Sequence, residues 1–215
     1  MKSKKKIITL VMCAVLLVVG SVMGTMAYLT SEDEVVNTFT VGNVSIKLDE
    51  AKANPDGTLV PNAARVKANA YKLIPGHTYN KDPMVTVLKG SEASYVKMTV
   101  TFSNARALDE IFKPNGANMT SIFNGYDSTN WIYKGNIKDE DANTRTYEFW
   151  YKETVDAPDS DVALDALFDS ITVPGTITNA QLATIKDMTI TVNAYAIQAD
   201  GFDTPEKAWA AWEDK

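Results

Sequence analysis

The sequence has a single cysteine, Cys13, and a single histidine, His77. Cys13 lies inside an N-terminal apolar run, so the chain beyond that run has no thiol for a disulfide or for nucleophilic catalysis. A His-Glu-x-x-His zinc motif is excluded, because it needs two histidines one helical turn apart. Glycine, proline and charge fractions are ordinary. That composition excludes collagen-like, coiled-coil and fully disordered proteins.

The N-terminus has the composition of an export signal. Four of the first six residues are lysines, and Ile7–Gly24 is an uncharged, largely apolar run of 18 residues. Thr25 and Ala27 then place small residues at the −3 and −1 positions that a signal peptidase requires. We therefore predict a signal peptide over residues 1–27, cleavage before Tyr28, and a secreted product. A retained membrane anchor is the alternative, because 18 residues are just long enough to span a bilayer.

Positive charge is scarce in the rest of the chain. Removing the signal peptide takes four lysines with it and leaves 17 basic against 27 acidic residues. Binding a phosphate backbone requires a basic surface, so this balance argues against a nucleic-acid partner. Contact with a membrane is expected only through the signal peptide, before it is cleaved. The mature chain is long enough for one domain with its own core.

Alternation of apolar and polar residues predicts a mainly β protein. The longest alternating stretches are 95–102, 146–151 and 188–196, and shorter ones are 44–48, 66–73, 84–88 and 131–133. Helical spacing and start signals predict helices over 105–112, over 161–170, and from Thr204-Pro205 onward. One antiparallel β-sandwich with short helical insertions and a C-terminal helix is the simplest architecture.

The tryptophans and the acidic clusters are candidate binding residues. Trp209 and Trp212 are three residues apart, so they share one face of the last helix, and we expect that face to dock on the sandwich. Trp150 has the opposite parity to its aromatic neighbours, which predicts that it faces the second sheet or is an exposed contact residue. A sugar-binding platform is the alternative to core packing for these aromatics. Carboxylates that suit calcium cluster at Asp139, Glu140 and Asp141, and at Asp156, Asp159, Asp161 and Asp165.

Neither acidic cluster has EF-hand spacing, so solvated loops are favoured, with Asp159 or Ser160 capping the helix that follows. His77 follows Pro75-Gly76 and is favoured as an exposed turn residue rather than a ligand. No motif identifies a catalytic residue, a metal ligand or a cofactor. We predict a non-enzymatic protein, with peptidase or glycosidase chemistry left open because any fold can bring two acids together.

Two stretches of the chain resemble a known family. One is Gly24-Thr25-Met26-Ala27-Tyr28-Leu29-Thr30-Ser31 followed by Asn37-Thr38-Phe39-Thr40-Val41-Gly42-Asn43-Val44. The other runs from Leu73-Ile74-Pro75-Gly76 through Val85-Thr86-Val87 to Tyr95-Val96-Lys97. Together with the last strand and its Trp-containing helix, they resemble the TasA and camelysin (CalY) proteins of Gram-positive bacteria, which a SipW-type signal peptidase processes. The resemblance covers residues 20–100 and the last strand and is weak across 104–187.

The resemblance implies a jelly-roll-like sandwich that is secreted to the cell surface or extracellular matrix and assembles, with itself and with other matrix proteins, into biofilm fibres. In such fibres the N-terminal segment of one subunit completes the sheet of its neighbour. Here that segment is about residues 28–49, ahead of a sandwich domain at 50–215. Its strand-forming residues are Phe39, Val41, Gly42, Val44, Ile46 and Leu48.

Three alternatives stay open beside the fibre prediction. The N-terminal segment is also able to pair within its own chain, with a bulge at Gly42-Asn43 where the alternation changes phase. A monomeric secreted accessory or binding module of the matrix has the same export signal and the same β pattern. Because camelysin-type proteins have been classed as metallopeptidases, an enzyme is the third alternative, although no recognisable catalytic motif supports it.

Overall fold

Antiparallel strands make up most of the chain that the computed structural model describes, which is residues 42–113, 122–185 and 187–213. The largest sheet has the order β10 (Ile190–Gln198), β4 (Ser91–Phe102), β6 (Thr144–Tyr151) and β5 (Trp131–Asp139), with β7 (Val155–Ala157) also paired to β4. A second sheet has the order β1 (Ile46–Asp49), β3 (Met84–Val87) and β8 (Val162–Ala163). A third pairs β2 (Thr78–Asn80) with β9 (Ser170–Thr172). The mainly β prediction is confirmed.

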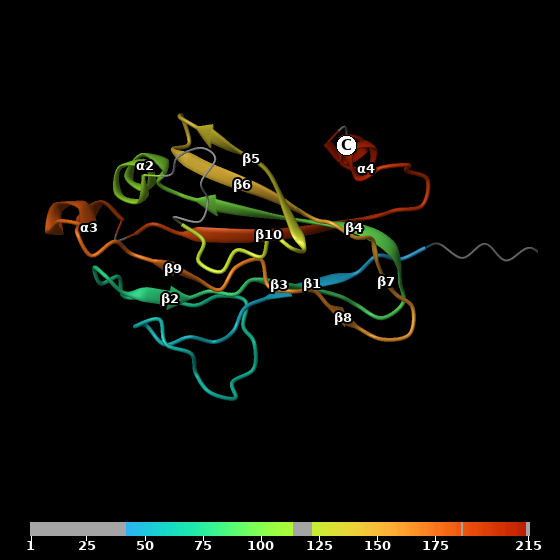
Figure 1. Ribbon diagram of the computed structural model, residues 1–215, viewed down its shortest axis with the longest axis horizontal. Helices are drawn as coiled ribbons and strands as arrows, with labels where there is room; N and C mark the ends of the chain where they lie inside the picture. The colour runs from blue at the N-terminus through green and yellow to red at the C-terminus, as the bar shows by residue number, and fades with distance from the viewer. Residues whose placement is uncertain (1–41, 114–121, 186, 214–215) are drawn as a thin grey trace, which may run out of the picture. The chain divides into compact units, whose positions relative to one another are not determined.

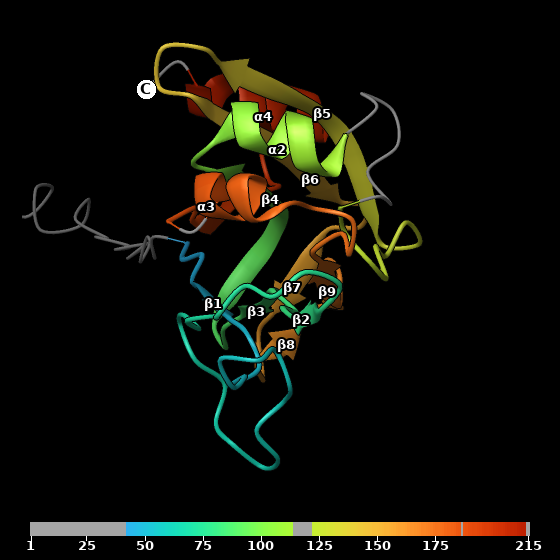
Figure 2. The ribbon, with the colours of Figure 1, turned by 90° about the vertical axis from the view of Figure 1, so that its left-hand side faces the viewer.

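The core lies between the large sheet and the smaller sheets, which form two layers in Figures 1 and 2. Strand β4 contributes alternate residues to the core, among them Met98 and Val100, and β3 faces it with Val85 and Val87. Phe123 lies at the centre of an aromatic cluster that includes Phe102, Tyr147, Phe149 and Phe168. Each fully buried side chain of this size stabilises the fold by about 1.5–3 kcal/mol. The alternation predicted for these strands determines which of their side chains face the core between the sheets.

Three helices complete the described chain: α2 (Ala105–Phe112), α3 (Asn179–Ile185) and α4 (Pro205–Glu213). Helix α2 has the predicted bounds, because the Asn104 side chain accepts a hydrogen bond from the backbone N–H of Ala107 at its start. The helix ends at Lys113, whose backbone is left-handed. Helix α3 was not predicted, although Thr178 and Gln181 form a capping box that marks its start.

Helix α4 packs on the outer face of the large sheet, with Trp209 buried against Trp150 at 6.2 Å between ring centroids. Trp212 is 39% exposed and contacts Tyr195, so both tryptophans dock as predicted. Trp150 lies neither on the second sheet nor in solvent: it is buried beneath α4, with the Lys134 ammonium 4.0 Å from its ring centroid. The prediction for Trp150 was wrong because α4 covers the outer face of the large sheet at this position.

The predicted helix over 161–170 is wrong. This segment contains β8 and irregular backbone, and β9 begins at its last residue, so Asp159 and Ser160 cap no helix. The N–H groups of Leu164 and Leu167 donate hydrogen bonds to the carbonyls of Val85 and Pro83. Leu164, Leu167 and Phe168 still reach the core, but from an extended segment lying along β3. Pairing to β3 satisfies backbone groups that a helix would have satisfied internally.

Candidate functional site

The predicted strand-addition segment lies only partly within the described chain. Ile46 and Leu48 belong to β1 and pair with Val87 and Val85 of the same chain, so their backbone is already used in its own sheet. Val44 is half-buried just before β1, and Gly42 lies beside Glu92. Phe39 and Val41 fall outside the described residues, as do Thr25, Ala27 and Tyr28. Gly42 and Asn43, where the sequence predicts a bulge, are described but belong to no strand, and β1 begins after them with an unshifted register to β3. The part of the segment from Ile46 onward therefore pairs within its own chain.

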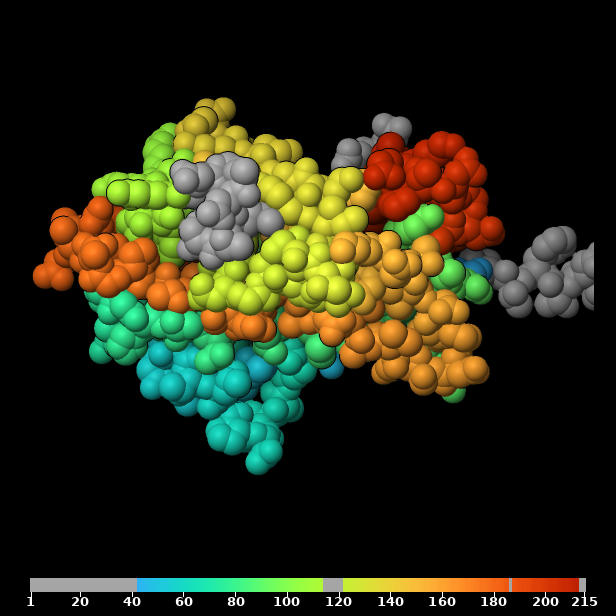
Figure 3. Space-filling model, viewed as in Figure 1, coloured from blue at the N-terminus to red at the C-terminus, as the bar shows by residue number. Residues whose placement is uncertain are grey.

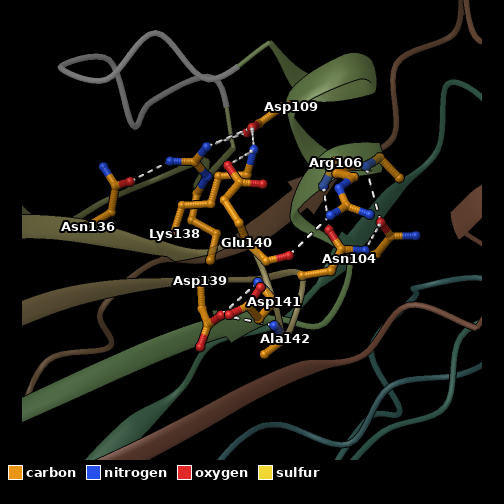
Figure 4. A network of polar contacts seen from close by, with 12 residues as sticks. Asn104, Arg106, Asp109, Asn136, Lys138, Asp139, Glu140, Asp141 and Ala142 are labelled. Carbon is orange, nitrogen blue, oxygen red and sulfur yellow. Dashed lines mark hydrogen bonds and ion pairs between the residues drawn. The ribbon is translucent and has the colours of Figure 1, made fainter.

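The acidic residues of the β5–β6 hairpin are bonded within the hairpin and to α2 (Figure 4). Asp139 accepts hydrogen bonds from the backbone N–H groups of Asp141 and Ala142 at 3.0 and 2.9 Å. Glu140 lies 2.8 Å from the Lys138 ammonium, which also lies 3.2 Å from Asp109 of α2. These contacts explain the cluster as a hairpin turn tied to a helix.

The second acidic cluster is exposed, and two of its members bond to protein groups. Asp161 accepts a hydrogen bond from the backbone N–H of Lys89, and Asp165 accepts one from the Asn130 side chain. His77 is exposed after its turn, as the sequence predicts. Within residues 42–113, 122–185 and 187–213, no three His, Cys, Asp or Glu side chains are grouped so as to hold a metal ion.

A groove lies beside the first residues of β10. It consists of two cavities of about 360 and 450 Å³ and a small one of about 40 Å³. Lys81 and Ile190 line all three cavities, so the cavities adjoin at these two residues. We call this feature the β10 groove; its remaining lining residues come mainly from 48–50, 67–73 and 187–192.

One wall of the β10 groove is a strand, and the other is a segment without regular secondary structure. β10 is the edge strand of its sheet and is paired, within the described chain, only to β4. The opposite wall is residues 67–71, which form no backbone–backbone hydrogen bond to any described residue. The sequence predicts a strand over 66–73, and this prediction is wrong for the described chain, where only Val66 forms a bridge, to Glu50. The segment has a strand-like pattern without a strand partner.

Contacts at its two ends hold the 67–71 wall in place. At one end the Arg65 guanidinium donates to the carboxylates of Asp49 and Asp82 at 2.6 and 2.8 Å. At the other end the Tyr71 hydroxyl donates to the carbonyl of Asn80 at 2.6 Å. The burial of Asp49 by itself raises the pKa of its carboxyl, but hydrogen bonds from Lys47 and Arg65 outweigh burial and hold that pKa below its ordinary value. The wall is therefore anchored, while its backbone groups bond to no backbone group of the described residues.

The floor of the β10 groove is apolar at one end and polar at the other. The apolar end is lined by aromatic and aliphatic side chains, among them Leu73, Phe102, Ile185 and Met188. The polar end holds a buried ion pair, in which the Lys81 ammonium lies 2.5 Å from Glu50 Oε2 and the two side chains are 10% and 6% exposed. The Asn69 amide donates to the other carboxylate oxygen of Glu50 at 2.9 Å.

This arrangement suits an extended peptide better than a small metabolite. An added strand would find unpaired backbone on β10 to one side and on 67–71 to the other, with pockets between them for alternate side chains. In Figure 3 the segment 51–73, coloured blue to green, gathers on one side of the domain, away from α4 in red. The sequence analysis predicted a donating segment, which stays a prediction, and it missed the groove and Lys81. The only signal in the sequence was a strand pattern over 66–73 that has no partner in the described chain.

Comparisons with known proteins add no relative: no family model, curated protein or solved structure matches this chain. Among the described residues, no helix has the length and apolar character needed to cross a membrane.

Proposed function

We propose that the chain is a secreted structural protein that self-assembles into extracellular matrix fibres of the TasA and camelysin type. In this proposal the residues before Gly42 of one subunit add as a strand to the next subunit. The observation that supports the proposal is the β10 groove, which is lined by the free edge of β10 and by residues 67–71, a segment with no backbone partner among the described residues. Main-chain pairing supplies affinity in such a site, and the pockets between the walls supply specificity.

The position at which the chain enters the domain supports assembly between subunits. The carbonyls of Asn43 and Ser45 accept hydrogen bonds from the N–H groups of Glu92 and Leu88, so this stretch is held against the β3–β4 connection before β1 begins. Glu92 lies two residues before Ser94, which pairs with Gln198 at the C-terminal end of β10. The groove lies at the opposite end of β10, eight residues away, which is about 27 Å at the usual strand rise.

The segment before Gly42 is long enough to reach a neighbour. Cleavage after Ala27 leaves residues 28–41, a stretch of 14 residues that spans up to about 50 Å when extended. A contact between one end of a subunit and the opposite end of the next is heterologous, and a heterologous contact that does not close into a ring gives an open filament. The charge of the mature chain keeps subunits soluble until the strand is exchanged.

The test is negative-stain electron microscopy of purified chain 28–215 during prolonged incubation, beside a chain that starts at Gly42. The shorter chain keeps β1 and all the other described elements, so its loss of assembly would not follow from a lost strand. We expect filaments from the first chain and separate particles from the second. Separate particles from both would overturn self-assembly and favour an accessory module that needs another subunit.

Chelation is the control for the enzyme alternative. Purified 28–215 is incubated with an unfolded protein substrate, with and without a chelator. We expect no cleavage under either condition. A proteolytic activity that the chelator abolishes would contradict the structural proposal.

A further inference from the structure

Lys81 is an unusual residue to find in a strand-binding groove. Its side chain is 10% exposed and lines all three cavities, and its ammonium has one hydrogen-bond acceptor among the described residues, Glu50 Oε2. A lysine ammonium has three N–H donors. A buried donor without an acceptor is costly, so a segment that fills the groove and excludes water must present an oxygen acceptor at this position. The residue of the added segment that lies next to it, toward Met188, must be apolar, because that end of the groove is lined by Leu73 and Phe102.

The chain's own N-terminal segment has this pattern. Residues 35–41 read Val-Val-Asn-Thr-Phe-Thr-Val, a stretch rich in β-branched residues, whereas residues 32–34 are all acidic. In a strand, Val35, Asn37, Phe39 and Val41 lie on one face, and Val36, Thr38 and Thr40 lie on the other. Asn37 is thus an oxygen acceptor with apolar residues two positions away on each side.

We propose, building on the proposed function, that residues 35–41 of a second copy fill the β10 groove antiparallel to β10, with the Asn37 side chain accepting a hydrogen bond from Lys81. Phe39 then lies over the apolar end toward Met188, and Val35 lies beside Val192. The backbone of Val36 lies opposite Thr191, an exposed residue of the edge strand.

The direction of the added strand identifies the second copy as its source. From Gly42, beside Glu92 and near the C-terminal end of β10, the chain runs through β1 to the groove-lining residues Asp49 and Glu50. A segment that runs antiparallel to β10 leaves the groove beyond Met188 and continues straight into the β1 of another subunit. A segment folding back onto its own groove has to reverse at Gly42 and run parallel to β10. Antiparallel docking therefore corresponds to a neighbour, and parallel docking to the same chain.

Paired cysteines test the direction, because the mature chain has no cysteine of its own. In the antiparallel register residue 36 faces Thr191, and in the parallel register it faces Thr189. Directly opposed residues of an antiparallel pair have Cα atoms about 4.5–5.5 Å apart, within the range of a disulfide. We expect Val36→Cys/Thr191→Cys chains to form a ladder of covalent multimers on oxidation, at least about tenfold faster than Val36→Cys/Thr189→Cys chains. A faster reaction of the Thr189 pair, or a cross-link within one chain, would overturn the proposal.

Substitutions in the segment test the contact with Lys81 without disturbing any described residue. Asn37→Leu keeps the size but removes the acceptor, and we expect it to raise the critical concentration for assembly on the order of tenfold. Asn37→Asp keeps an oxygen acceptor and should assemble within about threefold of the natural chain. Thr38→Leu, on the opposite face, is the matched control and should change the critical concentration little.

The outcomes separate the two proposals. Filaments that form equally well with Asn37→Leu and Thr38→Leu would overturn the Asn37–Lys81 contact and leave strand addition standing. A natural chain that forms no filaments would overturn the proposed function and this inference together.

Discussion

Replacing Lys81 by methionine should destabilise the domain strongly, because Glu50 would stay buried without its cation. The Glu50 side chain is 6% exposed, and after the change its remaining hydrogen bond within the described chain comes from Asn69. Removing one partner of a buried ion pair typically costs about 3–5 kcal/mol. We expect Lys81→Met to lower the free energy of unfolding by that amount. Urea denaturation of the monomeric fraction of 28–215, followed by tryptophan fluorescence, measures the change.

Two further variants identify the cause of that loss. Lys81→Met/Glu50→Gln removes both charges but keeps an acceptor for Asn69, so it should recover most of the lost stability. Lys67→Met removes an exposed lysine whose ammonium bonds the carbonyl of Leu48, and it should cost less than about 1 kcal/mol. A loss with Lys81→Met no larger than that with Lys67→Met would refute a buried, coupled pair at the floor of the groove.

Two predictions concern the docking of α4 and the ion pair between Asp49 and Arg65. Trp209→Ala should lower the unfolding free energy by about 3–5 kcal/mol in the same urea assay, because Trp209 is 2% exposed. Trp212→Ala should lower it by about 1 kcal/mol, because Trp212 is 39% exposed. Equal losses would show that α4 is not docked as described. The pKa of Asp49 is lowered on folding, so its contribution to stability is complete above the ordinary aspartate pKa and is lost as the pH falls below about 4. Arg65→Gln should flatten that loss in urea titrations at pH 2–5, and an unchanged pH profile would contradict the Asp49–Arg65 contact.

Alternation and caps predicted the elements whose interactions are mostly local or repeated along a strand. The stretch 95–102 lies within β4, and 146–151 lies within β6, because each has one buried and one outer face. Asn104 fixed the start of α2, and Thr204-Pro205 fixed the start of α4. The stretch 131–133 proved too short: β5 continues to Asp139 through a bulge at Gly135, whose positive φ and missing side chain interrupt the alternation.

The predictions that failed depend on which partner a segment finds. The spacing of Leu164, Leu167 and Phe168 fits one face of a helix, but β3 offers backbone partners that no local pattern records. Segment 66–73 has a strand pattern, and no described segment pairs with residues 67–71. Lys81 and Glu50 are 31 positions apart in the sequence, and only the folded chain brings them together. The candidate site therefore became visible only when both walls and the floor were assembled.

The most direct test of the central claim is to measure filament lengths when chain 42–215 is mixed into assembling 28–215 at one part in ten. The shorter chain keeps the β10 groove but has no segment to donate, so it accepts a neighbour and ends the filament. Strand addition into the β10 groove predicts filaments shortened to about ten subunits on average, because a head-to-tail polymer stops at a chain that offers only one of its two contacts. Filaments of undiminished length that exclude the shorter chain would contradict assembly by strand addition into this groove.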